Sequence, residues 1–409
     1  MAKINKKTFL ALGEKIKNYF DNLWKKTLSF FKAVKEFFKN PKKFIYDAKA
    51  RKKAIINDVY EPLVHNPENI LEVNRLKMYF PIKAGFFKWT VGYVKAVDGI
   101  SFQIKRGTTM GLVGESGCGK TTVGRTILRL YQKTGGEVLF NGEDINSLSK
   151  KELRAIRPKI QIIFQDPYSS LSPRLPVGEI IAEAVREHNI VPKEELDDYI
   201  TKIMEACGLR DFHKDRYPHE FSGGQRQRIS IARALALDPK FIVCDEPVSA
   251  LDVSIQAQII NLLKDLQDKF GLTYLFISHD LSVVEHISDT VGVMYLGELV
   301  EYAPTEGIFK NPMHPYTKAL LSAIPVPDPN YKMKRIILEG SIPSPANPPS
   351  GCKFHTRCSE CMEVCKTVVP RNIEVAPEHF VRCHLYDTEG MLLEEAKRQA
   401  KRESESLKQ

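Results

Sequence analysis

The glycine-rich segment of residues 114–121, GESGCGKT, has the residue types and spacing of a phosphate-binding loop. An apolar run at residues 110–113 precedes it, and a helical pattern over residues 121–131 follows it. Glycines let backbone N–H groups turn towards phosphate oxygens, and a helix N-terminus adds partial positive charge. We expect Lys120 to reach the β- and γ-phosphates of a nucleotide and the Thr121 hydroxyl to bind Mg²⁺. The expected nucleotide-binding residues of the loop are Gly114, Glu115, Ser116, Gly117, Cys118, Gly119, Lys120, Thr121 and Thr122.

Two adjacent acids, Asp245 and Glu246, follow a second apolar run at residues 241–244. A carboxylate at the end of a buried strand could hold Mg²⁺ directly or through water, and we expect this role for Asp245. Glu246 is placed to orient and activate an attacking water as a general base. Acids at a strand end can also be purely structural, and the phosphate-binding loop upstream is what favours the catalytic interpretation.

These motifs resemble those of the ATPase subunit of an ABC transporter, over about residues 70–330. The resemblance implies that Gln165 is the Q-loop glutamine, which contacts Mg²⁺ and the attacking water. It also implies that His279 is the switch histidine, which contacts the γ-phosphate. Together with Glu246, these two side chains are the expected catalytic residues. Every motif is intact, so we expect a site that hydrolyses ATP.

Motifs elsewhere in the chain extend this resemblance. The family signature, which caps the γ-phosphate of ATP held by the opposite subunit, corresponds to Ser222, Gly223, Gly224 and Gln225. Asp252 lies in the D-loop, which crosses the interface between two subunits. Phe80 stands where the family places an aromatic ring against adenine, with Tyr79 and Tyr93 as alternatives, although residues 81–92 look like an insertion. Because this chain carries one copy of each motif, the resemblance implies that ATP is held between two ATPase subunits.

Further segments narrow the resemblance to one group of importers. Residues 314–317 (HPYT), 319–321, 338–340 and 169–173 are similar to the ATPases of oligopeptide and dipeptide importers, and residues 85–98 to their F-type member. This implies ATP-driven peptide import by a complex with a second, non-identical ATPase subunit, two transmembrane permease subunits and an extracellular solute-binding protein. An importer of nickel or another small solute is the alternative, because the ATPase does not touch the cargo. A soluble ABC ATPase of DNA repair or translation is a remoter one.

Five of the eight cysteines lie close together in the C-terminal region. Four of them, Cys352, Cys358, Cys365 and Cys383, have a spacing that resembles the C-terminal cysteine set of this family, which binds a 4Fe–4S cluster in some members. Four thiolates also suit structural Zn²⁺, and the remaining alternative is that no metal binds. Cys361 is extra, either as a free thiol or as an alternate ligand. We expect a structural role for this cluster of thiols.

The first 53 residues carry sixteen Lys and Arg against four acids, a charge of +12, whereas the whole chain has +10. The other residues therefore sum to −2 and offer no basic track for nucleic acid. Aromatic residues recur at helical spacing among the lysines, which predicts an amphipathic helix. Three interpretations stay open for residues 1–56: binding to an anionic membrane surface, docking on the transporter, or disorder. No signal peptide or transmembrane stretch is evident, so we expect a peripheral protein at the cytoplasmic face of the plasma membrane.

Apolar runs that alternate with helical patterns predict an α/β fold with a mainly parallel sheet, the core of an ABC-type P-loop NTPase. The expected strands lie at residues 71–74, 97–104, 110–113, 240–245 and 272–278, and expected helices at 121–131, 176–217 and 254–270. We divide the chain into a basic helical arm (1–65), an ABC ATP-binding domain (70–325) with a helical signature subdomain (about 166–235), a Pro-rich linker and Cys-rich C-terminal extension (326–388), and a charged tail (389–409).

Overall fold

The computed structural model describes residues 63–84, 89–325 and 335–387. The chain divides into two compact units, Met1–Val59 and Tyr60–Gln409, and all described residues belong to the second. The amphipathic helix expected in the basic arm and the charged tail lie outside the described residues. The interpretations of these two segments therefore stay predictions.

The larger sheet has eight strands in the order β11-β12-β10-β9-β3-β8-β7-β6. Its parallel part consists of β3 (Thr109–Val113), β6 (Ile160–Ile163), β7 (Phe241–Asp245), β8 (Thr273–Ile277) and β9 (Thr290–Tyr295). Every residue of β3, β7 and β8 is buried, as is typical of parallel strands covered on both faces. The antiparallel strands β10 (Glu298–Pro304), β12 (His379–Val381) and β11 (Ile373–Ala376) continue this sheet. The expected α/β fold with a mainly parallel sheet is confirmed.

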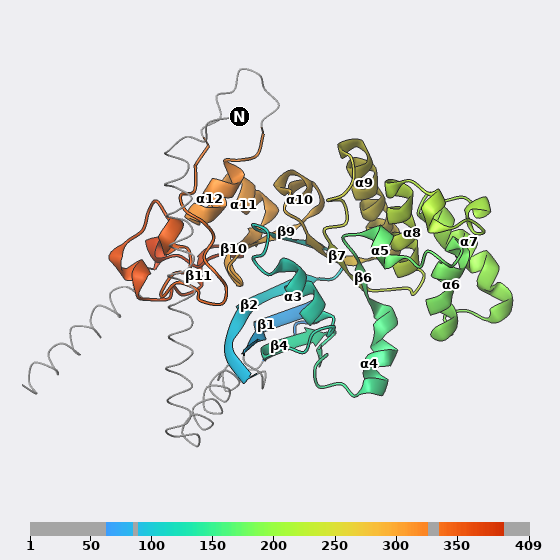
Figure 1. Ribbon diagram of the computed structural model, residues 1–409, viewed down its shortest axis with the longest axis horizontal. Helices are drawn as coiled ribbons and strands as arrows, with labels where there is room; N and C mark the ends of the chain where they lie inside the picture. The colour runs from blue at the N-terminus through green and yellow to red at the C-terminus, as the bar shows by residue number, and fades with distance from the viewer. Residues whose placement is uncertain (1–62, 85–88, 326–334, 388–409) are drawn as a thin grey trace, which may run out of the picture. The chain divides into compact units, whose positions relative to one another are not determined.

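A second sheet contains four antiparallel strands in the order β2-β1-β4-β5. They are β1 (Asn69–Ala84), β2 (Trp89–Lys105), β4 (Gly135–Phe140) and β5 (Glu143–Asp144). The sequence patterns predicted short segments of β1 and β2 but not this sheet. Helix α3 (Lys120–Ile127) contacts strands of both sheets, beside which it lies in Figure 1. Its Val123 and Ile127 are buried in the core that the two sheets share. The helix that begins at the phosphate-binding loop is therefore fixed by two sheets.

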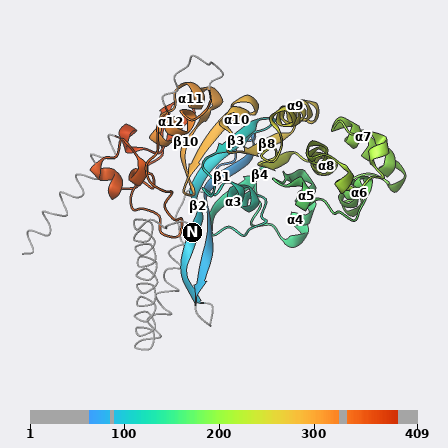
Figure 2. The ribbon, with the colours of Figure 1, turned by 45° about the horizontal axis from the view of Figure 1, so that its top comes forward.

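The remaining helices lie between or after the strands, with α5–α8 in succession between β6 and β7. They are α4 (Lys150–Ile156), α5 (Pro167–Ser170), α6 (Val177–Glu187), α7 (Leu196–Ala206), α8 (Gly223–Leu235), α9 (Val253–Phe270), α10 (Leu281–Ile287), α11 (Thr305–Lys310) and α12 (Pro315–Leu321). Single 3-10 turns lie at Arg157–Lys159, Lys193–Glu195, Asp211–His213, Pro218–Glu220, His355–Arg357, Glu363–Lys366 and His384–Tyr386. Helices α5–α8 gather beyond β6, at the opposite end of the larger sheet from β11 (Figures 1 and 2).

The C-terminal residues 335–387 contain short turns and the strands β11 and β12. The Pro-rich stretch at residues 342–350 has neither helix nor strand, and its Pro345 carbonyl accepts a hydrogen bond from the N–H of Lys95 in β2 (3.1 Å). This stretch therefore lies along the nucleotide-binding core. None of the helices in the described part of the chain combines the length and the apolar character needed to cross a bilayer.

Candidate nucleotide-binding site

The phosphate-binding loop connects β3 to α3 through glycines in conformations that other residues avoid. Gly114, Gly117 and Gly119 have φ values of 148°, 80° and 111°. A Cβ on Gly119 would lie 2.1 Å from the carbonyl oxygen of Ala96, so only glycine fits there. Buried Lys120 donates from Nζ to the carbonyls of Gly114 (2.8 Å) and Glu115 (3.3 Å). The loop therefore surrounds the Lys120 ammonium group, as is expected of a phosphate-binding loop.

The first turn of α3 meets the end of β7. The Thr121 hydroxyl donates to Oδ1 of Asp245 at 2.7 Å, and Asp245 is 1% exposed. Burial raises the pKa of Asp245, against the hydrogen bond from Thr121 and the charge of Arg125, whose Nη2 lies 3.8 Å from Oδ2. A hydroxyl beside a buried carboxylate fits a hard cation such as Mg²⁺, which would offset the cost of burying the charge. The role of Arg125 had no signal in the sequence, because helical spacing does not show which strand end a side chain faces.

Glu246 is the point where three expected catalytic side chains meet. The Gln165 amide donates to Oε2 of Glu246 at 2.9 Å, and Nδ1 of His279 lies 3.4 Å from the same oxygen. Glu246 has a φ of 49°, a left-handed conformation that is costly for a residue with a side chain. Its N–H donates to the carbonyl of Ile277 (3.0 Å), which holds this conformation. The ends of the adjacent strands β6, β7 and β8 thus bring together the residues that can orient water and accept its proton.

The signature residues form the N-terminus of α8, apart from this centre. Ser222 Oγ accepts from the N–H of Gln225 (3.3 Å), and Gln225 Oε1 accepts from the N–H of Ser222 (3.0 Å), which makes a reciprocal cap. This exposed helix start can receive an anion. Figures 1 and 2 show α8 among α5–α7, whereas α3 lies against the two sheets. Asp252 is also exposed, and it precedes α9.

The aromatic ring expected against adenine belongs to β1. Phe80 is half-buried and packs edge-on against Tyr131, with ring centroids 5.4 Å apart. Tyr79 is buried, and its hydroxyl donates to Asp98. Tyr93 on β2 is half-buried and pairs with Pro81. The adenine-stacking role of Phe80 stays a prediction.

The four C-terminal cysteines gather without forming a preorganised metal site. Burial raises the pKa of Cys352 to about 12 and the pKa of Cys358 and Cys383 to about 11, and neighbouring thiolate charges act in the same direction. The N–H of Cys352 donates to the carbonyl of Cys365 (2.8 Å), which brings these two segments together, and none of the eight cysteines forms a disulfide. Within residues 63–84, 89–325 and 335–387, however, no group of three or more His, Cys, Asp or Glu side chains is arranged to hold a metal ion.

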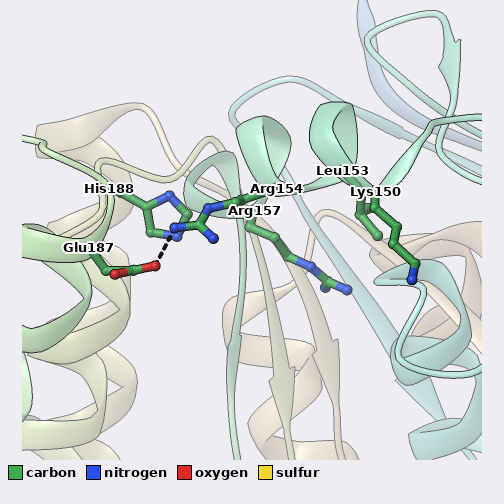
Figure 3. Close-up of a pocket in the computed structure, with 6 residues that line it drawn as sticks. All are labelled: Lys150, Leu153, Arg154, Arg157, Glu187 and His188. Atoms are coloured by element: carbon green, nitrogen blue, oxygen red, sulfur yellow. Dashed lines mark hydrogen bonds and ion pairs between the residues drawn. The ribbon is translucent and has the colours of Figure 1, made fainter.

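A surface pocket of about 330 Å³ lies away from all of these residues, between α4 and the end of α6. Figure 3 shows Arg154 paired with Glu187 across it. Lys150, Leu153, Arg157 and His188 complete its lining. The nucleotide site is thus defined by convergent side chains and the loop rather than by this pocket.

Two residues of the C-terminal half contact the phosphate-binding loop, and sequence reasoning did not identify them. The hydroxyl of Tyr316 accepts from the N–H of Glu115 (2.9 Å), and Arg357 donates to both carboxylate oxygens of Glu115 (2.7 and 3.1 Å). Tyr316 lies in the 314–317 segment that resembles oligopeptide importers, and Arg357 lies between Cys352 and Cys358 of the cysteine set. That was the available signal, although it did not point to the loop.

A phosphate-binding loop, a carboxylate pair and a helical signature on this α/β fold define an ABC-type ATPase. The chain matches the family "ABC transporter" over residues 97–249 and the family "Oligopeptide/dipeptide transporter, C-terminal region" over residues 300–365. It is 56% identical over 324 residues to the oligopeptide transport ATP-binding protein AppF of Bacillus subtilis (strain 168), with 78% of this chain and 98% of AppF covered. A putative peptide import ATP-binding protein of Brucella ovis is 57% identical over 290 residues, with 71% and 92% covered.

Solved structures agree with this assignment. The cbiO1 protein from Clostridium perfringens, part of the ABC transporter complex cbiONQ, is 28% identical with a TM-score of 0.52, covering 60% of this chain and 92% of its own. The ATP-binding cassette MJ0796, dimeric in a post-hydrolysis state with ADP and Pi, is 28% identical with a TM-score of 0.51, covering 57% and 98%. The chain belongs to the ABC transporter family and is an ATPase subunit of the oligopeptide/dipeptide transporter group.

Proposed function

We propose that this ATPase subunit energises the import of peptides across the plasma membrane. The observation that carries the proposal is that one chain combines a candidate hydrolytic centre with the C-terminal region of peptide transporters. The side chains of Gln165, Glu246 and His279, to which we assign hydrolysis, lie in contact, and residues 300–365 match the C-terminal region of oligopeptide and dipeptide transporters. The relatives from Bacillus subtilis and Brucella ovis are named for oligopeptide transport and peptide import. Nickel or another small solute is the alternative cargo.

The geometry supports a hydrolytic mechanism centred on Glu246. Its carboxylate accepts a proton from water as the water oxygen bonds to the γ-phosphorus, and the bond from phosphorus to the bridging oxygen breaks, which yields ADP and phosphate. Gln165 orients the water and the carboxylate, and His279 contacts the γ-phosphate. Lys120 and the backbone N–H groups of the loop bind the phosphates. Thr121 and Asp245 would hold Mg²⁺, which would supply positive charge to neutralise the phosphates.

We also propose that the signature at Ser222–Gln225 acts on ATP held by a second ATPase subunit. Support comes from its place on α8, apart from the loop at the start of α3, and from the dimeric state of the related cassette MJ0796. The second subunit is expected to be a non-identical one, and two permeases and a solute-binding protein complete the complex. Residues 1–56 remain candidates for contact with the membrane surface on the basis of their sequence.

Uptake of a labelled peptide by cells that lack this gene tests the proposal. We expect uptake to be lost, to return with the wild-type chain, and not to return with Glu246→Gln. Uptake of labelled nickel is measured in parallel. Loss of nickel uptake with normal peptide uptake would replace peptide by metal as the cargo, and normal uptake of both would remove the importer role.

For the cysteines we propose one metal centre, a 4Fe–4S cluster in preference to Zn²⁺. Its support is the proximity of Cys352, Cys358, Cys365 and Cys383 and their spacing. The side chains do not fit a preformed site, and no step of hydrolysis depends on a metal there. Iron, sulfide and zinc are measured in protein purified without oxygen. Stoichiometric zinc would select the alternative, and absence of all three would leave the cysteines as thiols.

A further inference from the structure

We propose that Arg357 is a positioning residue for nucleotide binding, because it neutralises and holds Glu115 of the phosphate-binding loop. The Cys-rich C-terminal segment would then set the affinity of the loop for ATP. This inference concerns the ATP site and does not depend on the cargo.

The contact between the two residues is direct and largely shielded from water. Arg357 donates Nη1 and Nη2 to the two carboxylate oxygens of Glu115, at 2.7 and 3.1 Å. The Arg357 side chain is 7% exposed and the Glu115 side chain 26%. Two parallel bonds to one carboxylate fix its orientation as well as its charge. The pair joins positions 242 residues apart in the chain.

Glu115 is part of the cradle itself. Its N–H donates to the Tyr316 hydroxyl (2.9 Å), and its carbonyl accepts from the N–H of Cys118 (3.2 Å) and from Nζ of Lys120 (3.3 Å). Because the carbonyl of Glu115 contacts the Lys120 ammonium, the carboxylate, one glutamate side chain from that carbonyl, lies within roughly one Debye length of the loop, about 8 Å at physiological salt. An unpaired carboxylate at this distance repels a triphosphate, and Arg357 cancels that repulsion.

The residues next to Arg357 are anchored to the nucleotide-binding core. In the same segment, Lys353 donates to Asp98 (2.8 Å) and to the Leu296 carbonyl (3.0 Å), and it lies 3.1 Å from Glu298. Phe354 is 1% exposed and packs edge-on against Tyr295, with centroids 5.2 Å apart. These contacts anchor the stretch between Cys352 and Cys358 to the nucleotide-binding core. Arg357 therefore presents its charge from a fixed position.

The test is a double-mutant cycle on the full chain, with equilibrium binding of a fluorescent ATP analogue as the readout. Arg357→Gln leaves the Glu115 charge uncompensated and should weaken binding by roughly 3- to 10-fold at low salt. Glu115→Gln removes the carboxylate and leaves the positive charge of Arg357 beside the loop, so it should strengthen binding of the analogue at low salt. The double variant, in which both charges are absent, should regain most of the lost affinity. Arg371→Gln, which breaks the ion pair with Asp387 in the same segment, is the matched control and should bind as the wild type does.

The salt dependence of binding distinguishes an electrostatic role of Arg357 from a structural one. In about 1 M salt, where the Debye length is about 3 Å, the deficit of Arg357→Gln should shrink towards the wild-type value. The proposal would be overturned if Arg357→Gln still bound the analogue weakly in high salt and if the double variant bound it no better than Arg357→Gln. Arg357 would then have a purely structural role. If Arg357→Gln does not fold, Glu115→Gln alone decides the question: clearly weaker binding of the analogue would contradict the electrostatic role.

Discussion

Glu246, the proposed general base, accepts a hydrogen bond from Gln165 and has a strained backbone conformation that its N–H bond to Ile277 stabilises. Glu246→Gln keeps the size of the side chain but cannot accept a proton. We expect this variant to bind ATP and to hydrolyse it about 10²- to 10⁴-fold more slowly, measured as phosphate release. Glu285→Gln, at an exposed position on α10, is the control and should keep normal turnover. Near-normal turnover of Glu246→Gln would show that another group activates the water.

His314 makes the stability of the protein depend on pH. It is 1% exposed, and Nδ1 accepts from the N–H of Tyr316 at the start of α12 (3.1 Å), which requires an unprotonated Nδ1. Burial lowers the pKa of His314 from 6.5 to about 4. The unfolded chain therefore takes up this proton at a higher pH than the folded chain. The contribution of His314 to the free energy of unfolding is fully present above pH 6.5 and is lost as the pH falls towards 4.

His314→Asn tests this dependence, because asparagine caps a helix but does not titrate. Urea unfolding at several pH values between 4 and 7 should give a free energy that falls less steeply for the variant than for the wild type. The two chains should converge in slope above pH 6.5, the ordinary pKa of histidine. Equal slopes throughout would assign the acid sensitivity to other groups.

At this scale, sequence patterns predicted the residues whose chemistry is local. The loop at 114–121 and the acids Asp245 and Glu246 follow apolar runs that predict strands, and parallel strands bring such ends together. The roles of Gln165 and His279 were implied by the family resemblance rather than by a local pattern. Arg357 could not be predicted in the same way. Its partner Glu115 lies in a remote segment, and only the packing of the C-terminal residues on the core joins them.

The start of helix α3 depends on the absence of a side chain at Gly119. It begins α3 at a φ of 111°, with the carbonyl of Ala96 in β2 against it. Gly117 also has a positive φ, 80°, but a Cβ there would meet no atom within 4 Å. Gly119→Ala should therefore lower the free energy of unfolding by about 1–3 kcal/mol more than Gly117→Ala, because it adds overpacking to a similar backbone cost.

Thermal and urea unfolding of the two alanine variants measure this difference. Equal losses would mean that β2 moves away from the loop at little cost. The comparison isolates the steric term, since both substitutions replace glycine at a positive φ in the same loop.

The elements themselves were only partly predictable. Short apolar runs gave β3, β7 and β8, which are buried along their whole length. The long hairpin of β1 and β2 was not predicted, because residues 81–92 carry no clear alternation and look like an insertion. The structure pairs them nonetheless, from Pro81 opposite Tyr93 to Ala84 opposite Trp89. Pairing between distant strands, such as β1 with β4, leaves no local pattern to read.

For the whole molecule, one hydrogen-bonded sheet joins regions that look separate in the sequence. The sheet runs from β6, next to the helices α5–α8, to β11 in the Cys-rich segment. Composition changes along the chain suggested a C-terminal extension behind a linker. The pairing of Glu301 with Val381 and of Tyr302 with Phe380 makes β12, within the Cys-rich segment, part of the same sheet as the nucleotide-binding core.

We expect the pairing of β12 with β10 to protect the protein from aggregation as well. Without residues 341–387, the N–H and C=O groups of β10 that face away from β9 would form an open sheet edge, and such an edge pairs readily with other chains. A chain truncated after residue 340 should therefore form open-ended oligomers that grow with concentration, as light scattering after gel filtration can measure. The full chain should form none, and an equally monodisperse truncated chain would refute this role. The Cys-rich segment would then have a second role, which is to cover the edge of β10 and prevent its pairing with other chains.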